Sequence, residues 1–298
     1  MRFTTAITVD EALAALADGA QPIAGGSDMM VGHRQGKAPL PDHVVAIDRI
    51  ESMRQIETTE HGVTIGALVS HHMIESHPLI GERYSALADS SALVGSPSTR
   101  NVGTLGGNVM NASPAMDTGA PLVVLGASAV LRSTSDTRSV ALPDLWLSPG
   151  RTSAAADELC VAITLPAPSP RSGSAYVRLE YRRAMEIAVV GAAASVTLDN
   201  DGNIAGIAVA LTAVAATIIS VTGLERLHGR MVDDAVAAAQ RLAAEQARPI
   251  SDLRASDRYR RHCIGVMARR AVEAAAHRAT GGVIAVPVNR SLGIGTAS

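Results

Sequence analysis

The longest uncharged stretch of this chain decides whether it crosses a membrane or fills a folded core. Residues 204–221 are 18 consecutive residues without a charged side chain, just long enough for a spanning helix to be considered. The stretch is rich in Val, Ile and Thr, however, and it follows an Asp-Gly turn at 199–202 and an earlier apolar run at 187–198. Two β-branched runs around such a turn are typical of a β-hairpin. The sequence therefore predicts a buried hairpin and no membrane span.

The length of the chain and its prolines predict the domain organisation. A chain of 298 residues suggests roughly two domains. The segment 166–170 (PAPSP) cannot continue a helix or a central strand, so we place the domain boundary there. Strands and helices do not alternate strictly, which favours an α+β fold. We expect domains at 1–168 and 171–280, followed by a tail at 281–298 that is either disordered or packed on a partner.

Local patterns predict many of the individual elements. Thr8 to Glu11 has the sequence of a capping box, and we expect the helix that follows to end at Gly19. Other periodic segments predict strands at 21–24, 43–48, 62–68 and 158–165, and helices at about 80–93, 233–246 and 256–279.

Composition argues against several classes of protein. The formal net charge is −2, with 26 basic and 28 acidic residues and no basic cluster, so we expect no nucleic-acid partner. The two cysteines, Cys160 and Cys263, are too few to ligate an iron–sulfur cluster, and we expect both to be buried and reduced. Asp10 and Glu11 interrupt any apolar run at the N-terminus, so no signal peptide is predicted and the cytoplasm is the expected location.

No sequence pattern indicates a catalytic nucleophile or a metal site. A recognisable Ser-His-Asp or Cys-His arrangement is absent from the sequence, so no catalytic residue is expected. His71 and His72 are adjacent and no third ligand is near them, so we expect solvent-exposed or capping histidines. Trp146 is expected to be a packing residue, with a subunit contact as the alternative.

Two glycine-rich loops are the candidates for ligand binding. Residues 23–29 (IAGGSDM) follow a predicted strand, and residues 103–108 (GTLGGN) follow a predicted turn. Paired glycines permit positive φ and close approach of a ligand, and successive backbone N–H groups form an anion site. A pyrophosphate held between the loops is one interpretation. Ordinary tight turns are the other, because neither loop is a Rossmann or Walker A fingerprint. Asp28 is either a ligand contact or a helix N-cap.

Both loops resemble those of a known family. Residues 24–28 are similar to the first FAD loop, and residues 100–108 to the second, of the flavoprotein subunits of the xanthine dehydrogenase and carbon monoxide dehydrogenase family. Residues 111–117 (NASPAMD), 182–190 (RRAMEIAVV) and 256–261 (SDRYRR) also fit this family. The resemblance runs in order through nearly the whole chain, and the second loop with its continuation is its most specific part.

The resemblance implies a fold and a set of cofactor contacts. It implies an FAD-binding domain of the vanillyl-alcohol-oxidase (PCMH) type in subdomains of about 1–55 and 56–168, then a smaller C-terminal α+β domain. It further implies that the two loops wrap the FAD diphosphate and that a basic residue near the flavin stabilises its reduced, anionic form. The implied cofactor-binding residues are Ile23, Ala24, Gly25, Gly26, Ser27, Asp28, Met29, Ala67, Gly103, Thr104, Leu105, Gly106, Gly107, Asn108, Ser113, Asp117 and Arg178.

The sequence departs from some relatives at two places. Residues 93–95 (LVG) stand where some relatives stack an aromatic ring on the isoalloxazine. Some relatives also carry an additional iron–sulfur cluster in this subunit, which the two cysteines exclude here.

By this resemblance, the chain is the FAD-carrying subunit of a molybdenum-containing hydroxylase. It would relay electrons from the 2Fe-2S clusters of a small subunit to an acceptor such as NAD, oxygen or a quinone. A large subunit would hold molybdopterin and oxidise the substrate, and the complex would be a dimer of heterotrimers. The alternatives are a self-contained FAD oxidoreductase that acts on a small molecule, and a binding protein that has lost the cofactor.

Overall fold

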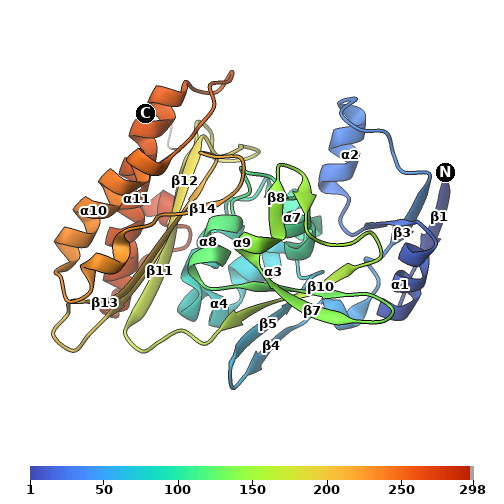
Figure 1. The fold of residues 1–298 in the computed structure, drawn as a ribbon, viewed down its shortest axis with the longest axis horizontal. Helices are drawn as coiled ribbons and strands as arrows, with labels where there is room; N and C mark the ends of the chain where they lie inside the picture. The colour runs from blue at the N-terminus through green and yellow to red at the C-terminus, as the bar shows by residue number, and fades with distance from the viewer. Residues whose placement is uncertain (296–298) are drawn as a thin grey trace. The chain divides into compact units, whose positions relative to one another are not determined.

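The computed structural model describes residues 1–295 and divides the chain into two compact units. The first unit comprises residues 1–71, 97–112 and 127–167, and the second comprises residues 72–96, 113–126 and 168 onward. Both units contain helices and strands (Figure 1), so the predicted α+β class is confirmed. The units divide between Ala167 and Pro168, inside the proline-rich linker.

Each unit combines short helices with sheets. The first contains β1 (Arg2–Thr5), α1 (Val9–Ala17), β2 (Gln21–Ile23), α2 (Ser27–Arg34), β3 (His43–Ala46), the 3-10 helix η1 (Glu51–Met53), β4 (Ile56–Thr59), β5 (Gly62–Gly66), α6 (Pro97–Val102), α7 (Leu105–Met110), β6 (Ser128–Arg132), β7 (Thr137–Ala141), α9 (Leu142–Leu145), β8 (Trp146–Ser148), β9 (Arg151–Thr152) and β10 (Leu159–Pro166). The second contains α3 (His71–Ser76, which starts at the last residue of a first-unit segment), α4 (Pro78–Arg83), α5 (Ser85–Ser91), α8 (Gly119–Val124), β11 (Ser172–Leu179), β12 (Val190–Leu198), β13 (Ile204–Thr212), β14 (Ile219–Ser220), the 3-10 helix η2 (Leu224–Leu227), α10 (Val232–Gln246), α11 (Asp257–Ala279) and α12 (Val288–Ser291).

The first unit is built on a small parallel sheet and a larger antiparallel one. The strand order is β1-β3-β2 in the first sheet and β4-β5-β10-β6-β7 in the second. Helix α1 starts at the predicted cap, where the Thr8 hydroxyl accepts a hydrogen bond from the Glu11 backbone N–H at 3.2 Å. The Glu11 carboxylate accepts from the backbone N–H of Ile7 at 2.8 Å, one residue before the position that a standard capping box would use.

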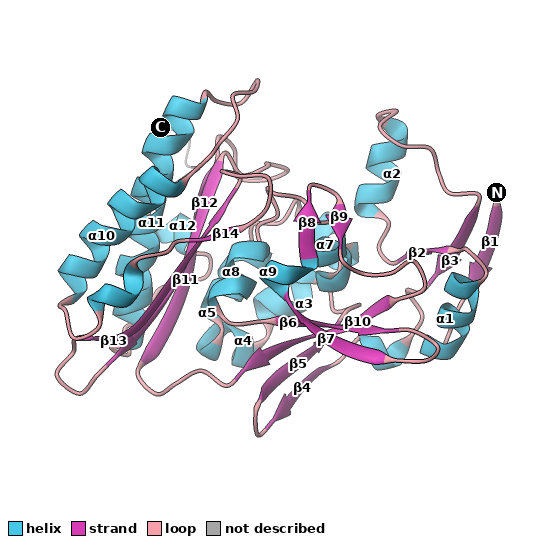
Figure 2. Ribbon diagram, viewed as in Figure 1, coloured by secondary structure: helices cyan, strands magenta, loops and turns pink. Residues whose placement is uncertain are grey.

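The second unit is a four-stranded antiparallel sheet with helices on both faces (Figure 2). Strands β12 and β13 pair around the turn at 199–203, with Gly191 opposite Thr212, so the predicted buried hairpin is confirmed. Ala175 of β11 packs into the core with α10 and α11, whereas the neighbouring Ser174 hydroxyl accepts from the backbone N–H of Ala86 in α5. Because both faces are covered, the strands are continuous apolar runs, and this explains the long uncharged stretch.

A buried ion pair connects four segments of the second unit. Asp89 of α5 is 0% exposed and accepts hydrogen bonds from both Nη atoms of Arg278, at 2.6 and 3.1 Å. Its carboxylate also accepts from the backbone N–H groups of Tyr176 and Val288. Burial raises the pKa of Asp89, and the hydrogen bonds oppose that rise. A buried carboxylate with this many donors is stable in charged form, and its loss would leave Arg278 unpaired.

The described part of the C-terminal tail packs on β11, an arrangement that neither sequence expectation included. The Asn289 side chain is fully buried; its oxygen accepts from the Arg178 backbone N–H at 3.0 Å and its nitrogen donates to the Arg178 carbonyl at 2.9 Å. An amide side chain thus pairs with an edge strand as another strand would. Residues 281–295 are therefore part of the second unit, and the last three residues of the predicted tail lie outside the described residues.

The structure also tests predictions made for single residues. Cys160 and Cys263 are buried and free, as expected. Trp146 is a packing residue, 5% exposed, and its indole Nε1 donates to the Val109 carbonyl at 2.9 Å. Within residues 1–295, no helix is long and apolar enough to cross a membrane.

Candidate functional site

The first glycine loop joins β2 to α2. Gly26 is the N-cap of α2 and has φ +67°, a left-handed conformation that side-chain-bearing residues rarely adopt. Within the described residues, no side chain caps this eight-residue helix. The first-turn N–H groups have no intrahelical acceptors and lie at the positive end of the helix dipole. The start of α2 therefore presents hydrogen-bond donors suited to an anion.

Asp28 is the second residue of α2, so the N-cap interpretation is wrong for it. The residue is exposed, yet neighbouring atoms desolvate its carboxyl enough to raise the pKa above the usual value. A carboxylate in a first helical turn interacts favourably with the helix dipole. Of the two roles considered for Asp28, ligand contact is the one still open.

The two glycine loops touch each other at Gly25. A Cβ added to Gly25 would lie 1.8 Å from the Val102 carbonyl oxygen and 3.2 Å from the Gly103 nitrogen. Backbone atoms cannot move aside as the end of a flexible side chain can, so glycine is required at Gly25. The structure thus brings together, within the first unit, the two segments that the sequence singled out.

The second loop is held along one side by the segment that follows β5. The Gly106 N–H donates to the Ala67 carbonyl at 2.9 Å and the Leu105 N–H to the Val69 carbonyl at 3.0 Å. The Gly107 N–H donates to the hydroxyl of Thr104, which is the N-cap of α7, at 3.1 Å. The first-turn donors of α7 are therefore already bonded within the protein. A cradle of free N–H groups, proposed from the sequence for both loops, describes only the first.

The paired glycines of the second loop have different surroundings. A Cβ on Gly106 would lie 2.5 Å from that of Ala67, so Gly106 and the buried Ala67 pack directly on each other. A Cβ on Gly107 would meet only the Thr104 hydroxyl, at 2.9 Å, and Gly107 is exposed. Gly107 and the half-buried Asn108 are therefore the positions where this loop is open to a ligand.

His71 is buried beside the second loop, so the expectation of an exposed or capping histidine is wrong for it. Its side chain is 1% exposed, its backbone N–H donates to the Gly103 carbonyl at 3.1 Å, and its Nδ1 atom has no hydrogen-bond partner within residues 1–295. Burial, with a smaller contribution from Arg100, lowers the pKa of His71 to about 4. His72 is exposed, as expected, and lies 3.0 Å from a Glu75 carboxylate oxygen. Groups of side chains able to hold a metal ion are absent from the described residues.

The remaining predicted site residues lie in the second unit. The Ser113 hydroxyl accepts from the Ala115 N–H at 3.3 Å, which forms a turn before α8. Asp117 is 7% exposed and accepts from the Tyr176 hydroxyl at 2.8 Å and from Arg178 Nη1 at 2.6 Å. The carboxylate therefore already has partners in the protein, although its remaining lone pairs can still accept a further hydrogen bond.

Arg178 is fully buried between two carboxylates. Its Nε donates to Glu180 at 2.8 Å, and its Nη1 donates to Asp117 at 2.6 Å. Burial lowers the pKa of Arg178, but Asp117 and Glu180 outweigh this effect and keep the guanidinium charged. The cluster holds one positive and two negative formal charges, so the positive charge expected from the sequence is compensated locally. Glu180 and Tyr176 were not predicted as members of this group, because no spacing pattern identifies them.

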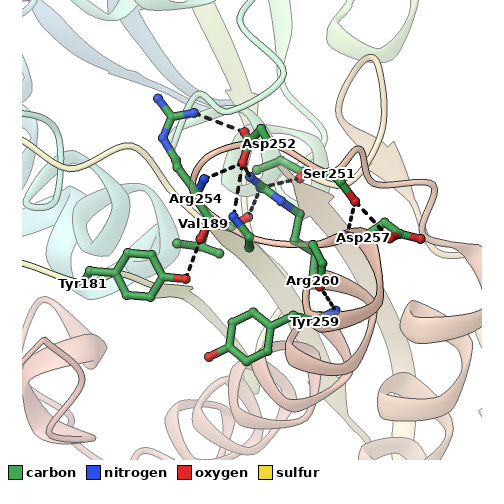
Figure 3. Close-up of polar contacts among 11 residues, drawn as sticks. Tyr181, Val189, Ser251, Asp252, Arg254, Asp257, Tyr259 and Arg260 are labelled. Atoms are coloured by element: carbon green, nitrogen blue, oxygen red, sulfur yellow. Dashed lines mark hydrogen bonds and ion pairs between the residues drawn. The ribbon is translucent and has the colours of Figure 1, made fainter.

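The late motif at 256–261 secures the loop that leads into β12 (Figure 3). Arg260 of α11 is 3% exposed and donates to the Val189 carbonyl, and its Nη2 donates to Asp252 Oδ1 at 2.7 Å. Burial tends to raise the pKa of Asp252, but hydrogen bonds from Arg254 and Arg260 lower it to about 2. The Tyr181 hydroxyl donates to the Arg254 carbonyl at 2.8 Å. Arg260 is thus a structural residue of the second unit.

Comparisons with known proteins agree with this arrangement. A family model described as the FAD binding domain in molybdopterin dehydrogenase matches residues 1–168, and one described as the CO dehydrogenase flavoprotein C-terminal domain matches residues 174–275. The carbon monoxide dehydrogenase medium chain of Afipia carboxidovorans is 31% identical over 276 residues, which cover 90% of this chain and 92% of that protein. The nicotinate dehydrogenase FAD-subunit of Eubacterium barkeri is 34% identical over 183 residues, which cover 60% of this chain and 62% of that protein.

A solved structure gives the same result for the fold. Carbon monoxide dehydrogenase from Hydrogenophaga pseudoflava, in a form lacking the Mo-pyranopterin moiety of its molybdenum cofactor, matches with a TM-score of 0.88 and 30% identity, covering 93% of this chain and 98% of that chain. The family model spans more than half of the chain, and the resemblance drawn from the glycine loops is confirmed. The chain belongs to the family of FAD-binding medium subunits of molybdopterin-dependent dehydrogenases.

Proposed function

We propose that this chain carries FAD and passes electrons from the 2Fe-2S clusters of a partner subunit to a terminal acceptor. The observation that carries the proposal is the contact of the two glycine loops at Gly25, beside the uncapped start of α2. Family membership adds that the relatives are subunits of dehydrogenases and that the matching domain is an FAD-binding one. FAD supplies the chemistry when bound, because a flavin exchanges electrons singly or in pairs.

The residues of the first unit suit a dinucleotide diphosphate. The N–H groups at the start of α2 and the Ser27 hydroxyl are hydrogen-bond donors for phosphate oxygens. In the second loop Gly107 is exposed and has no side chain to obstruct a ligand, and Asn108 adds an amide. Ala67 acts as support, because it packs under Gly106. The other residues of the predicted set, Ile23, Ala24, Met29, Thr104 and Leu105, complete the two loops.

The second-unit residues of the predicted set stay proposals. Asp117 is proposed to accept a ribose hydroxyl, as carboxylates do in other nucleotide sites, while it keeps its bonds to Tyr176 and Arg178. Ser113 is proposed as a further polar contact. Arg178 is proposed to affect the flavin through the net charge of its cluster with Asp117 and Glu180, since its own charge is compensated by both carboxylates.

We further propose that a small iron–sulfur subunit and a large molybdopterin subunit complete the enzyme as a dimer of heterotrimers in the cytoplasm. The relatives named as medium chains or FAD-subunits support a multi-subunit enzyme. The substrate would then be oxidised on the large subunit, and this chain needs no acid, base or nucleophile of its own. A self-contained oxidoreductase stays the alternative, and it predicts activity without partners.

The first test is the visible absorption spectrum of the chain, expressed alone and co-expressed with the proposed iron–sulfur and molybdopterin subunits. A flavin band, with FAD identified after release, and co-purification of iron-containing and molybdenum-containing subunits would support the proposal. Colourless protein in both preparations, with no uptake of added FAD, would contradict the cofactor assignment. Substrate oxidation by the flavin-loaded chain alone would favour the self-contained oxidoreductase.

A second test addresses the Arg178 cluster. Glu180→Gln keeps an oxygen that can accept from Arg178 Nε but removes one negative charge from the cluster. If the flavin experiences this charge, its midpoint potential should become more positive in the variant, because reduced flavin is anionic. An unchanged midpoint potential, with FAD bound at wild-type affinity, would show that the charge of the Arg178 cluster does not affect the flavin.

A further inference from the structure

The loop between α10 and α11 is held in one conformation by its own hydrogen bonds. Asp252 Oδ1 accepts from the backbone N–H of Arg254 at 2.8 Å and from Nη2 of the buried Arg260 at 2.7 Å (Figure 3). The Ser251 hydroxyl donates to the Asp257 carboxylate at 3.0 Å and accepts from the Asp257 backbone N–H at 2.9 Å. The loop is therefore ordered before any partner binds, which lowers the entropic cost of binding one.

This ordered loop presents an apolar side chain to solvent. Leu253 directly precedes Arg254 and is fully exposed. The Arg254 carbonyl accepts from the hydroxyl of Tyr181, which is itself exposed. The pKa of the exposed Tyr259 is raised by a hydrogen bond with Cys263, by burial and, to a smaller extent, by Tyr181, so the two phenols lie near each other. A single exposed leucine is ordinary, but one on a preformed loop beside two tyrosines is typical of an interaction site.

The charge around these side chains is positive. Residues 252–261 contain four arginines and two aspartates, in a chain whose formal net charge is −2. Arg254 and Arg260 share the carboxylate of Asp252, whereas Arg258 is exposed and forms no ion pair within residues 1–295. So few unpaired arginines do not suit a phosphate backbone, which needs clustered basic residues. They suit a protein face that carries carboxylates around an apolar pocket.

We propose that the Leu253 surface, formed by Tyr181, Leu253, Arg254, Arg258 and Tyr259, docks the proposed iron–sulfur subunit. Leu253 would enter an apolar pocket of that subunit, and the arginines would face carboxylates at its rim. This inference rests on the proposed function. Relay of electrons to the flavin requires the iron–sulfur subunit to contact this chain directly, whereas the molybdopterin subunit needs direct contact only with the iron–sulfur subunit.

Substitutions on the Leu253 surface should weaken binding and leave the fold intact. Leu253→Asp should raise the dissociation constant for the iron–sulfur subunit about 10- to 100-fold, as expected for loss of a buried leucine contact. The melting temperature of the chain should be unchanged, because Leu253 is fully exposed. Arg258→Glu should weaken binding about tenfold at low salt and less at high salt, where the charges are screened.

Val283→Asp is the matched control. Val283 is another exposed aliphatic residue of the second unit, and it follows the C-terminal end of α11, whereas Leu253 precedes the N-terminal end of that 23-residue helix. It should therefore leave the affinity for the iron–sulfur subunit unchanged.

The experiment measures binding of the FAD-loaded full chain to the proposed iron–sulfur subunit by biolayer interferometry at low and high salt, together with thermal melting of each variant. Binding to the molybdopterin subunit alone and self-association of the chain are measured in parallel. Equal affinity of Leu253→Asp and Val283→Asp for the iron–sulfur subunit would overturn the proposal, as would a loss confined to the molybdopterin subunit or to self-association. If the wild-type chain binds neither subunit, the proposed function fails, and this inference fails with it.

Discussion

The two glycine loops have similar sequences but use their glycines differently. In the first loop, Gly26 adopts a left-handed φ and starts a helix that no side chain caps within the described residues. In the second, Thr104 caps α7, and Ala67 and Val69 accept the next two backbone N–H groups. The first loop therefore keeps backbone donors for a ligand, whereas the donors of the second loop are hydrogen-bonded within the protein, two of them to the segment after β5. Similar glycine pairs can thus serve binding in one place and packing in another.

Substitution of Gly25 should disrupt the contact between the two loops more than any other change. Gly25→Ala would place a methyl group against the Val102 carbonyl, at 1.8 Å, so the loops must separate. We expect FAD affinity to fall by more than about 100-fold, because the positions of both glycine loops depend on this contact. Fluorescence titration with FAD and thermal melting would measure the effect.

Gly32 supplies the matched control for that variant. It lies in α2, and a Cβ there would meet nothing within 4 Å. Gly32→Ala should leave FAD binding intact and stabilise the helix by about 0.5–1 kcal/mol. If Gly25→Ala bound FAD as tightly as Gly32→Ala does, the loops would not meet at Gly25 in solution.

Acid should destabilise the second loop more than the first. The pKa of His71 is lowered from 6.5 to about 4, so the unfolded chain takes up a proton on His71 at a higher pH than the folded chain does. The contribution of His71 to stability is therefore constant above pH 6.5 and falls by about 3 kcal/mol as the pH drops from 6.5 to 4. Urea unfolding of the cofactor-free protein at pH 7 and pH 4.5 would show this loss.

His71→Leu isolates this acid sensitivity. It should unfold with a smaller difference between the two pH values than the wild type, since it has no imidazole to protonate. Hydrogen exchange should show residues 103–108 opening at a higher pH than residues 25–28, because the His71 backbone N–H is bonded to Gly103. Equal acid sensitivity in the wild type and the Leu variant would contradict the assigned cause.

Alanine at each glycine of the second loop should separate packing from binding. Gly106→Ala brings a methyl group within 2.5 Å of the Ala67 Cβ, and we expect a loss of about 2 kcal/mol in unfolding free energy from overpacking. Gly107→Ala places a methyl group 2.9 Å from the Thr104 hydroxyl and can at most displace that cap, so it should cost up to about 1 kcal/mol of stability and weaken FAD binding about tenfold. Chemical denaturation and FAD titration would be run on both variants. Equal effects of the two variants in both assays would contradict the assignment of Gly106 to packing and Gly107 to binding.

The cap of α7 should have a smaller effect on stability than the close contact at Gly106. Thr104→Ala removes the oxygen that accepts from the Gly107 N–H, at a cost of about 1 kcal/mol. Thr104→Ser keeps that oxygen and should stay close to the wild type in chemical denaturation. The corresponding contrast cannot be made in the first loop, where Gly26 is the cap and has no side chain. If Thr104→Ser were as unstable as Thr104→Ala, the hydroxyl would not be the group that stabilises the start of α7.

Much of the fold followed from local sequence patterns. The hairpin of β12 and β13 was predicted because Asp-Gly turns and β-branched runs act over a few residues, and helix α1 was predicted because Thr8 caps it. Strand β1 and the short helix α7 were not predicted, and a helix at α2 was considered only as the alternative in which Asp28 is its N-cap. The start of α7 depends on bonds to Ala67 and Val69, and these residues are far from it in the sequence.

The candidate site was predicted as a set of residues and not as a set of contacts. The two loops were identified, and they meet at Gly25. His71 was expected to be exposed or to cap a helix, because neighbouring histidines give no sign of which one faces the interior. The resemblance implied a positive charge at Arg178 near the flavin. It did not indicate that Asp117 and Glu180 pair with Arg178, because these residues share no recognisable motif with it.

The sequence by itself determined the α+β class, the two glycine loops, the proline-rich linker and that the uncharged stretch at 204–221 is no membrane-spanning helix, since each depends on residues that are neighbours in the chain. The tertiary structure alone decided which backbone donors stay free, that His71 is buried, and that Asn289 completes the edge of β11. Those features depend on which distant segments pack together, because burial and pairing are properties of the whole folded chain.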